Sequence, residues 1–185
     1  MILPLFRRSR RDRSINRLYG AIVAQARLPA FYADFGVPDT VEGRLDMIML
    51  HAALLLRRLQ EVPELEALGQ EVFDRFCQDM DDNLREMGVG DLAVPRQMQR
   101  IAGAFYGRAA AYGAALDTLD AVGLVDALRR NIYSDEPAAE EPVRRLAAYV
   151  QAAVVHVRRQ DSTALSAGLV SFPDPPAAAG AATAP

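Results

Sequence analysis

The chain has 185 residues, enough for one domain with a substantial apolar core. Hydrophobic residues make up 51 % of it and charged residues 24 %, the balance of a globular domain, and no apolar run approaches the ~20 residues that a transmembrane helix needs. The one cysteine excludes a disulfide within the chain, so the composition favours a reducing compartment such as the cytoplasm.

Charge is distributed unevenly along the chain. The formal net charge is -3, but the first 20 residues hold six arginines and one aspartate, whereas the rest hold 15 arginines and 23 acidic residues. The start, MILPLFRRSRRDRS, is not a secretory signal because no apolar stretch follows its arginines. Three interpretations of residues 1–13 stay open: a solvated tail, an anchor to anionic lipid, and contact with RNA phosphates. The arginines concerned are Arg7, Arg8, Arg10, Arg11 and Arg13.

Alanine and leucine are abundant and β-branched residues are sparse, which predicts an all-α fold. A first helix is expected to begin near Ser14 and to end before Pro29, because apolar residues from Ile15 to Ala26 recur on one face. The segment AFYADFGVPDT reads as a short connection with room for one helical turn.

The second predicted helix follows Asp39-Thr40-Val41-Glu42. Asp39 and Glu42 have the spacing of a capping box, in which Asp39 would be the N-cap. Apolar residues then occupy several faces as far as Leu59, so we expect this helix to be at the centre of the core.

A third helix is predicted from residue 64 to residue 87, after Pro63. Gly88 stands where a left-handed C′ residue belongs, with Val89 placed for the hydrophobic contact that accompanies it. Pro95 suits the first turn of a fourth helix, which runs to about residue 116.

Asp117 or Thr118 is predicted to cap a fifth helix that ends near Tyr133, and a sixth helix is predicted over residues 142–159. The end of the chain, PDPPAAAGAATAP, is too small and polar to order itself. The expected architecture is a single-domain bundle of about six helices: a basic segment at 1–13, the helical domain at 14–160 and a mostly disordered tail at 161–185.

The stretch DDNLREMGVGDLAVPRQM at 81–98 invites a test for calcium. A loop that starts at Asp79 would place Asp81 and Asn83 correctly, but it has Leu84 where glycine is required and Gly90 where the bidentate carboxylate is required. The pattern therefore predicts the solvated face of a helix and no metal site.

No reaction is suggested by the remaining chemically active residues. His51 lies in the most apolar stretch, which predicts a hydrogen-bonded core histidine, and His156 lies on another helix. Neither has a Cys or carboxylate at the spacing of a zinc or haem ligand. Cys77 has no motif around it and is expected to be a buried thiol. No nucleophile elbow and no phosphate-binding loop are present, which predicts a protein without enzymatic activity, cofactor or small-molecule substrate.

Four stretches together resemble the ubiquinol–cytochrome c chaperone family, in its alphaproteobacterial form. They are RLYGAIVAQAR, FYADFGVPDTVEGRLDMIMLHAALLLRRL, FDRFCQDMDDNLREMGVGDLAVPRQM and AFYGRAAAY, and they occur in order between about residues 14 and 133. The resemblance implies an all-α chaperone that binds newly made cytochrome b and supports assembly of the bc1 complex. It also implies a cytoplasmic protein that works at the inner membrane or the ribosome, with no DNA partner.

Such a chaperone needs a groove between helices with exposed apolar side chains. The hypothesis places client contact at Tyr19, Phe31, Tyr32, Val37, Leu92, Val94, Met98, Phe105 and Tyr106. Five charged residues would hold the helices together or meet the polar ends of the client: Arg44, Asp46, Arg85, Glu86 and Arg108. Two other functions stay open, namely binding of an isoprenoid lipid such as ubiquinone in an apolar interior, and a ribosome or RNA adaptor.

Overall fold

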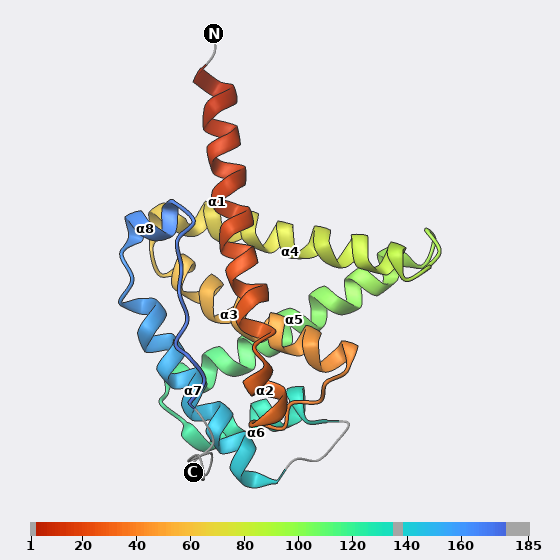
Figure 1. Cartoon of the computed structure of the whole chain (residues 1–185), viewed down its shortest axis with the longest axis vertical. Coiled ribbons are helices and arrows are strands. Elements are labelled where there is room, and N and C mark those ends of the chain that lie inside the picture. The colour runs from red at the N-terminus through yellow and green to blue at the C-terminus, as the bar shows by residue number, and fades with distance from the viewer. Residues whose placement is uncertain (1–2, 135–138, 177–185) are drawn as a thin grey trace, which may run out of the picture.

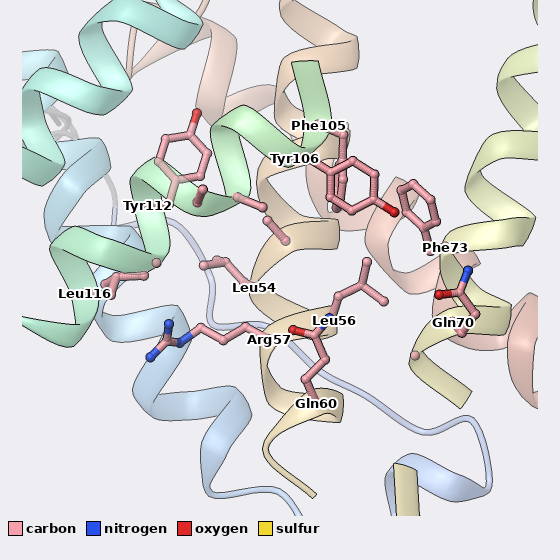
Figure 2. Close-up of a pocket in the computed structure, with 15 residues that line it drawn as sticks. Leu54, Leu56, Arg57, Gln60, Gln70, Phe73, Phe105, Tyr106, Tyr112 and Leu116 are labelled. Carbon is pink, nitrogen blue, oxygen red and sulfur yellow. The ribbon is translucent and has the colours of Figure 1, made fainter. Parts of the chain in front are cut away.

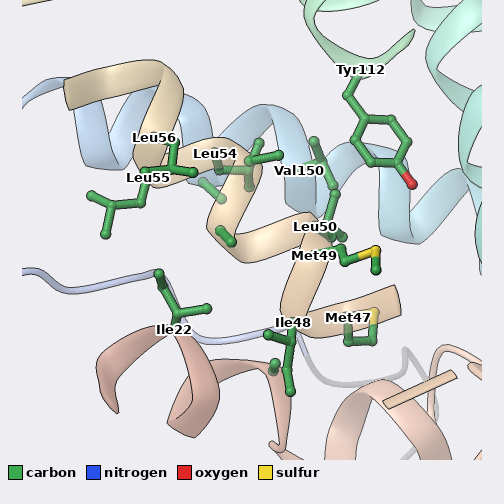
Figure 3. Close-up of a cluster of buried hydrophobic side chains, with 14 of the residues drawn as sticks. Ile22, Met47, Ile48, Met49, Leu50, Leu54, Leu55, Leu56, Tyr112 and Val150 are labelled. Carbon is green, nitrogen blue, oxygen red and sulfur yellow. The ribbon is translucent and has the colours of Figure 1, made fainter. Parts of the chain in front are cut away.

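Helix α3 (Val41–Gln60) lies at the centre of the computed structural model, which describes residues 3–134 and 139–176 (Figure 1). Its residues 47–56 are buried without a break, because neighbouring helices cover every face. Figure 3 shows part of this core, where Ile22, Tyr112 and Val150 approach α3 from three other helices. The helices around α3 are α1 (Leu3–Ala26), α4 (Glu66–Glu86), α5 (Val94–Asp117), α6 (Ala121–Ile132) and α7 (Glu140–Arg158). The predicted central helix is confirmed.

The described residues contain α-helices and one 3₁₀ turn, η1 (Pro63–Leu65), with no strand among them. Six of the helices have 12 residues or more, and two short ones, α2 (Pro29–Ala33) and α8 (Ser162–Ser166), have five. The all-α prediction is therefore confirmed. No helix in this part of the chain has the length and apolar character needed to cross a membrane.

The first helix is longer than expected. It begins at Leu3 and not near Ser14, so its backbone runs through the segment predicted as a separate basic region. Arginine is a good helix former, and Pro4 falls in the first turn, where a missing N–H costs nothing. In Figure 1 the first turns of α1 extend beyond the other helices.

Two helix caps differ from the predictions. Thr40, and not Asp39, is the N-cap of α3: its Oγ1 accepts a hydrogen bond from Gly43 N at 3.0 Å, while Asp39 pairs with Arg44. Asp120 caps α6 by accepting from Gly123 N at 2.9 Å, because α5 continues through Asp117. In both cases the capping residue lies one to three residues beyond the predicted one.

The corner between α4 and α5 has the predicted glycine geometry. Gly88 has φ = 82°, its N–H donates to Arg85 O at 3.0 Å, and the N–H of Val89 donates to Leu84 O at 3.0 Å. These two bonds define a Schellman motif. Figure 1 shows α4 and α5 converging on this corner away from the rest of the bundle. We call residues 81–100 the α4–α5 arm.

The C-terminal segment packs on the helical domain as far as residue 176. Leu165 of α8 is fully buried, Phe172 lies edge-on to His51 with ring centroids 5.2 Å apart, and Pro173 O accepts from Gln25 Nε2 at 2.9 Å. These contacts order the chain to residue 176, well into the tail predicted from 161. Residues 177–185, the rest of that tail, lie outside the described residues.

Candidate functional site

A groove opens between α3, α4 and α5 on the body side of the α4–α5 arm (Figure 2). Its volume is about 330 Å³. Small residues lie along it, and they leave room because neither Ala nor Gly projects far from the helix backbone. The small lining residues are Ala53, Gly69, Ala109, Ala110 and Gly113.

Aromatic rings form one wall of this groove. Phe73 of α4 lies 5.0 Å from Phe105 and 5.3 Å from Tyr106 of α5, measured between ring centroids. Phe105 is buried, whereas Tyr106 is 58 % exposed. The wall therefore begins in the core and ends in a ring that an incoming apolar side chain can contact.

Charged residues close the opposite end. Arg57 of α3 makes a two-pronged ion pair with Asp117 at the end of α5, with its second contact, Nη1 to Oδ2, at 3.3 Å. Glu61 lies 3.6 Å from Arg57 and also pairs with Arg158 of α7. The Arg57 guanidinium lowers the pKa of Asp117, so this carboxylate stays ionised at neutral pH. The network ties the ends of α3, α5 and α7 together.

The α4–α5 arm presents apolar side chains beyond the groove. Leu92 is 99 % exposed and Met87 is 67 % exposed. Arg85 pairs with Asp81 at 2.7 Å and with Asp91 across the corner, so ion pairs on both sides hold this turn. Exposed apolar residues on a protruding turn are typical of a surface that contacts another molecule.

A second polar cluster is closed to solvent. His51 is fully buried: its Nδ1–H donates to Met47 O at 2.8 Å, which leaves Nε2 to accept from the Tyr149 hydroxyl at 2.8 Å. Gln25 Nε2 donates to Tyr149 Oη at 3.0 Å. Burial lowers the pKa of His51 to about 4, so the ring is neutral at pH 7. We call His51 with Phe31, Phe35, Tyr149 and Phe172 the His51 cluster, a core histidine as predicted.

The structure divides the predicted client-contact residues into two sets. Tyr19, Phe31, Val37 and Val94 are buried in the core, and Phe105 is buried at the base of the groove. Tyr32 and Met98 are half-buried, and Leu92 and Tyr106 are exposed. Of the nine, only Phe105 and Tyr106 line the groove.

The predicted charged residues are also spread out. Asp46 of α3 accepts from Arg108 Nη2 of α5 at 2.7 Å, with side chains only 13 % and 20 % exposed, so this pair joins two helices. Arg44 pairs with Asp39, and Arg85 pairs with Asp81 and Asp91 within the α4–α5 arm. Glu86 is exposed.

The basic N-terminal residues are described in part. Arg11 pairs with Glu71 of α4, while Arg10 and Arg13 are exposed. The side chains of Arg7 and Arg8 lie outside the described part of the chain.

Two carboxylates of the segment that was tested as a calcium loop have partners on other residues. Asp79 accepts a hydrogen bond from the Tyr19 hydroxyl at 2.8 Å, and Asp81 is paired with Arg85. In the residues that the structure describes, no group of three His, Cys, Asp or Glu side chains is arranged to hold a metal ion. Burial raises the pKa of Cys77, which makes it a poor nucleophile.

The groove also includes three residues that were not predicted as client contacts: Phe73, Ala109 and Gly113. A signal for the two small residues is the run GRAAAYGAA at 107–115, where small residues recur four apart on one helix face.

Comparisons with known proteins agree on one family. The model of the family described as "Ubiquinol-cytochrome C chaperone" matches residues 33–172. The chain is similar in structure to the Cbp3 homolog from Brucella abortus, with a TM-score of 0.83 and 46 % sequence identity over 94 % of this chain and 97 % of that chain. Comparison with curated proteins gives no match. The matched region includes all of α3 to α7, and the chain belongs to the ubiquinol–cytochrome c chaperone family.

Proposed function

We propose that this protein is an assembly chaperone of the bc1 complex that binds newly made cytochrome b, and that the groove between α3, α4 and α5 is its client site. Family membership supports the assembly role. The observation that carries the site is the aromatic wall of Phe73, Phe105 and Tyr106, which runs from the buried Phe105 to the exposed Tyr106 beside a floor of alanine and glycine.

The shape of the groove suits an apolar helix as client. Side chains three and four apart on one helix form a ridge, and a trough with a floor of small residues accepts such a ridge. The exposed Leu92 and Met87 on the arm extend the apolar surface past the groove. A segment of cytochrome b that leaves the groove toward the arm would therefore stay shielded from water.

Site-specific photo-crosslinking tests this placement. A photoreactive residue at Tyr106 or Leu92 is expected to give adducts with cytochrome b in cells. The control position is Val122 of α6, which is 72 % exposed but lies outside the groove. Adducts from Val122 with none from Tyr106 and Leu92 would refute the groove.

Filling the groove gives an independent test. Ala110 is exposed and lines the groove, so Ala110→Trp occupies it without disturbing the core. The matched control is Ala114→Trp, which is exposed one turn further along α5 and does not line the groove. Ala110→Trp is expected to reduce recovery of cytochrome b with the protein, and Ala114→Trp to leave it near the wild-type level.

A deletion strain tests the assembly role itself. Loss of the protein is expected to lower cytochrome b and the assembled bc1 complex, and wild-type levels of both would refute the assignment. The isoprenoid alternative predicts a stoichiometric lipid in native mass spectrometry of gently purified protein.

A further inference from the structure

The exposed arginines of α1 lie on one face of the helix. Arg10, Arg13 and Arg17 are exposed and are spaced three and four residues apart, which places them on one side. Leu18 and Ile22, which are fully buried, are rotated away from these arginines by about 80° to 180° at 100° per residue. The arginine face of α1, as we call these three residues, is therefore turned away from α3 and α4.

Arg11, on the side of α1 that faces α4, takes part in contacts between the two helices. Arg11 pairs with Glu71 of α4, and one turn further Arg75 donates to Asn16 Oδ1 at 3.3 Å. The Tyr19 hydroxyl donates to Asp79 Oδ2 at 2.8 Å. These contacts fix the middle of α1 on α4 and determine the direction in which the arginine face points.

The helix also extends past the bundle. Its backbone continues from Arg10 back to Leu3, and Figure 1 shows these turns beyond the other helices. The sequence of the extension contains Arg7 and Arg8 together with Leu3, Leu5 and Phe6. It thus combines cationic and apolar residue types within two helical turns.

We propose that the arginine face of α1, with the extension that precedes it, binds the surface of a bilayer that contains anionic phospholipids. Guanidinium groups bind phosphate oxygens through paired hydrogen bonds, and a row of them attracts an anionic leaflet. The apolar residue types in the sequence of the extension favour a bilayer over RNA, because a bilayer offers an acyl boundary for apolar side chains below the headgroups that bind arginine. Since α1 is fixed on α3 and α4, binding holds the whole bundle in one orientation at the membrane.

Vesicle flotation of the full-length protein tests the proposal. The probe is phosphatidylcholine vesicles with about one-third phosphatidylglycerol, compared with vesicles of phosphatidylcholine alone. Binding is expected only to the anionic vesicles and is expected to weaken as salt is raised. Each arginine near the surface contributes about five-fold, so R10Q/R13Q/R17Q is expected to weaken binding by about 100-fold.

A second triple variant separates a local surface from net charge. R96Q/R100Q/R130Q removes the same charge from exposed positions on α5 and α6. It is expected to bind anionic vesicles within about three-fold of the wild type, because these arginines lie on other helices than the arginine face of α1. Equal loss in the two triple variants would overturn the proposal, and so would wild-type binding by R10Q/R13Q/R17Q.

The RNA alternative is measured in the same assay. Labelled single-stranded RNA is expected not to displace the protein from anionic vesicles, and displacement would overturn the choice of a bilayer. L5S/F6S is expected to reduce binding to vesicles, because it removes apolar insertion and no charge. Unchanged vesicle binding by L5S/F6S would also count against the bilayer. Circular dichroism checks that each variant keeps its helices.

Discussion

The His51 cluster and the α4–α5 arm both contain large apolar side chains, but the cluster buries them and the arm exposes them to solvent. In the cluster, aromatic rings from α2, α7 and the C-terminal segment meet around the neutral His51 of α3. In the arm, Leu92 and Met87 face solvent on a turn held by ion pairs. Apolar burial should concentrate stability in the first region, and apolar exposure leaves the second available for contact.

The largest expected difference comes from truncating one apolar side chain in each region. Phe31→Ala opens a cavity beside His51 and Tyr149 and is expected to cost about 3–5 kcal/mol of unfolding free energy. Leu92→Ala is expected to change stability by less than about 0.5 kcal/mol, because Leu92 is already hydrated. Urea unfolding followed by circular dichroism compares the two. Similar losses of unfolding free energy in the two variants would contradict the division into a stabilising cluster and an exposed arm.

The second largest expected effect is a loss of unfolding free energy at acid pH, caused by His51. The folded pKa of His51 is about 4 against an ordinary value of 6.5, so the unfolded chain takes up a proton first as pH falls. Stability from the neutral ring is complete above about pH 6.5, declines down to about pH 4 and then levels off, with a total near 3 kcal/mol.

The pH effect is measured as the difference in urea stability between wild type and His51→Gln from pH 7 to pH 4.5. Other titrating groups affect both proteins equally and cancel in this difference. The difference is expected to shrink as pH falls, because only the wild type loses stability when His51 takes up a proton. An NMR titration of His51 in the wild type gives a direct reading that does not depend on the variant's folding. A measured pKa near 6.5 would show that the ring is not buried as described.

A smaller difference in stability is expected between a shielded ion pair of the bundle and an exposed ion pair of the arm. Asp46 and Arg108 are mostly shielded from solvent, so Asp46→Ala leaves a guanidinium poorly compensated and is expected to cost about 2 kcal/mol. Asp81 in the arm pairs with Arg85 at an exposed site, and Asp81→Ala is expected to cost about 0.5 kcal/mol. A double-mutant cycle with Arg108→Ala isolates the Asp46–Arg108 coupling, which should exceed that of Asp81 with Arg85.

The smallest effect concerns the corner of the arm. Gly88 has φ = 82°, so Gly88→Ala forces a side chain into the left-handed region and is expected to cost about 1 kcal/mol. Gly90 is not among the positive-φ residues, and a Cβ there meets open space, so Gly90→Ala is expected to be neutral or slightly stabilising. Thermal unfolding of the two variants makes the comparison, and equal shifts would contradict the Schellman corner.

The candidate site was less predictable than the fold. Phe105 and Tyr106 are adjacent in sequence and both line the groove, yet Phe105 is buried and Tyr106 is exposed. Apolar residues of a core and of a client surface have the same helical period, so periodicity could not separate Val94, which is buried, from Leu92, which is exposed. Their burial depends on which helix packs opposite them.

The sequence by itself determined the all-α class, the central helix, the Gly88 corner and the family. The first three depend on local chemistry, namely helical periodicity and the conformational freedom of glycine. Only the tertiary structure decided the groove, the His51 cluster and the direction of the α1 arginines. These features join residues as distant as His51 and Phe172, or Arg11 and Glu71, and such contacts arise from the packing of whole helices around α3.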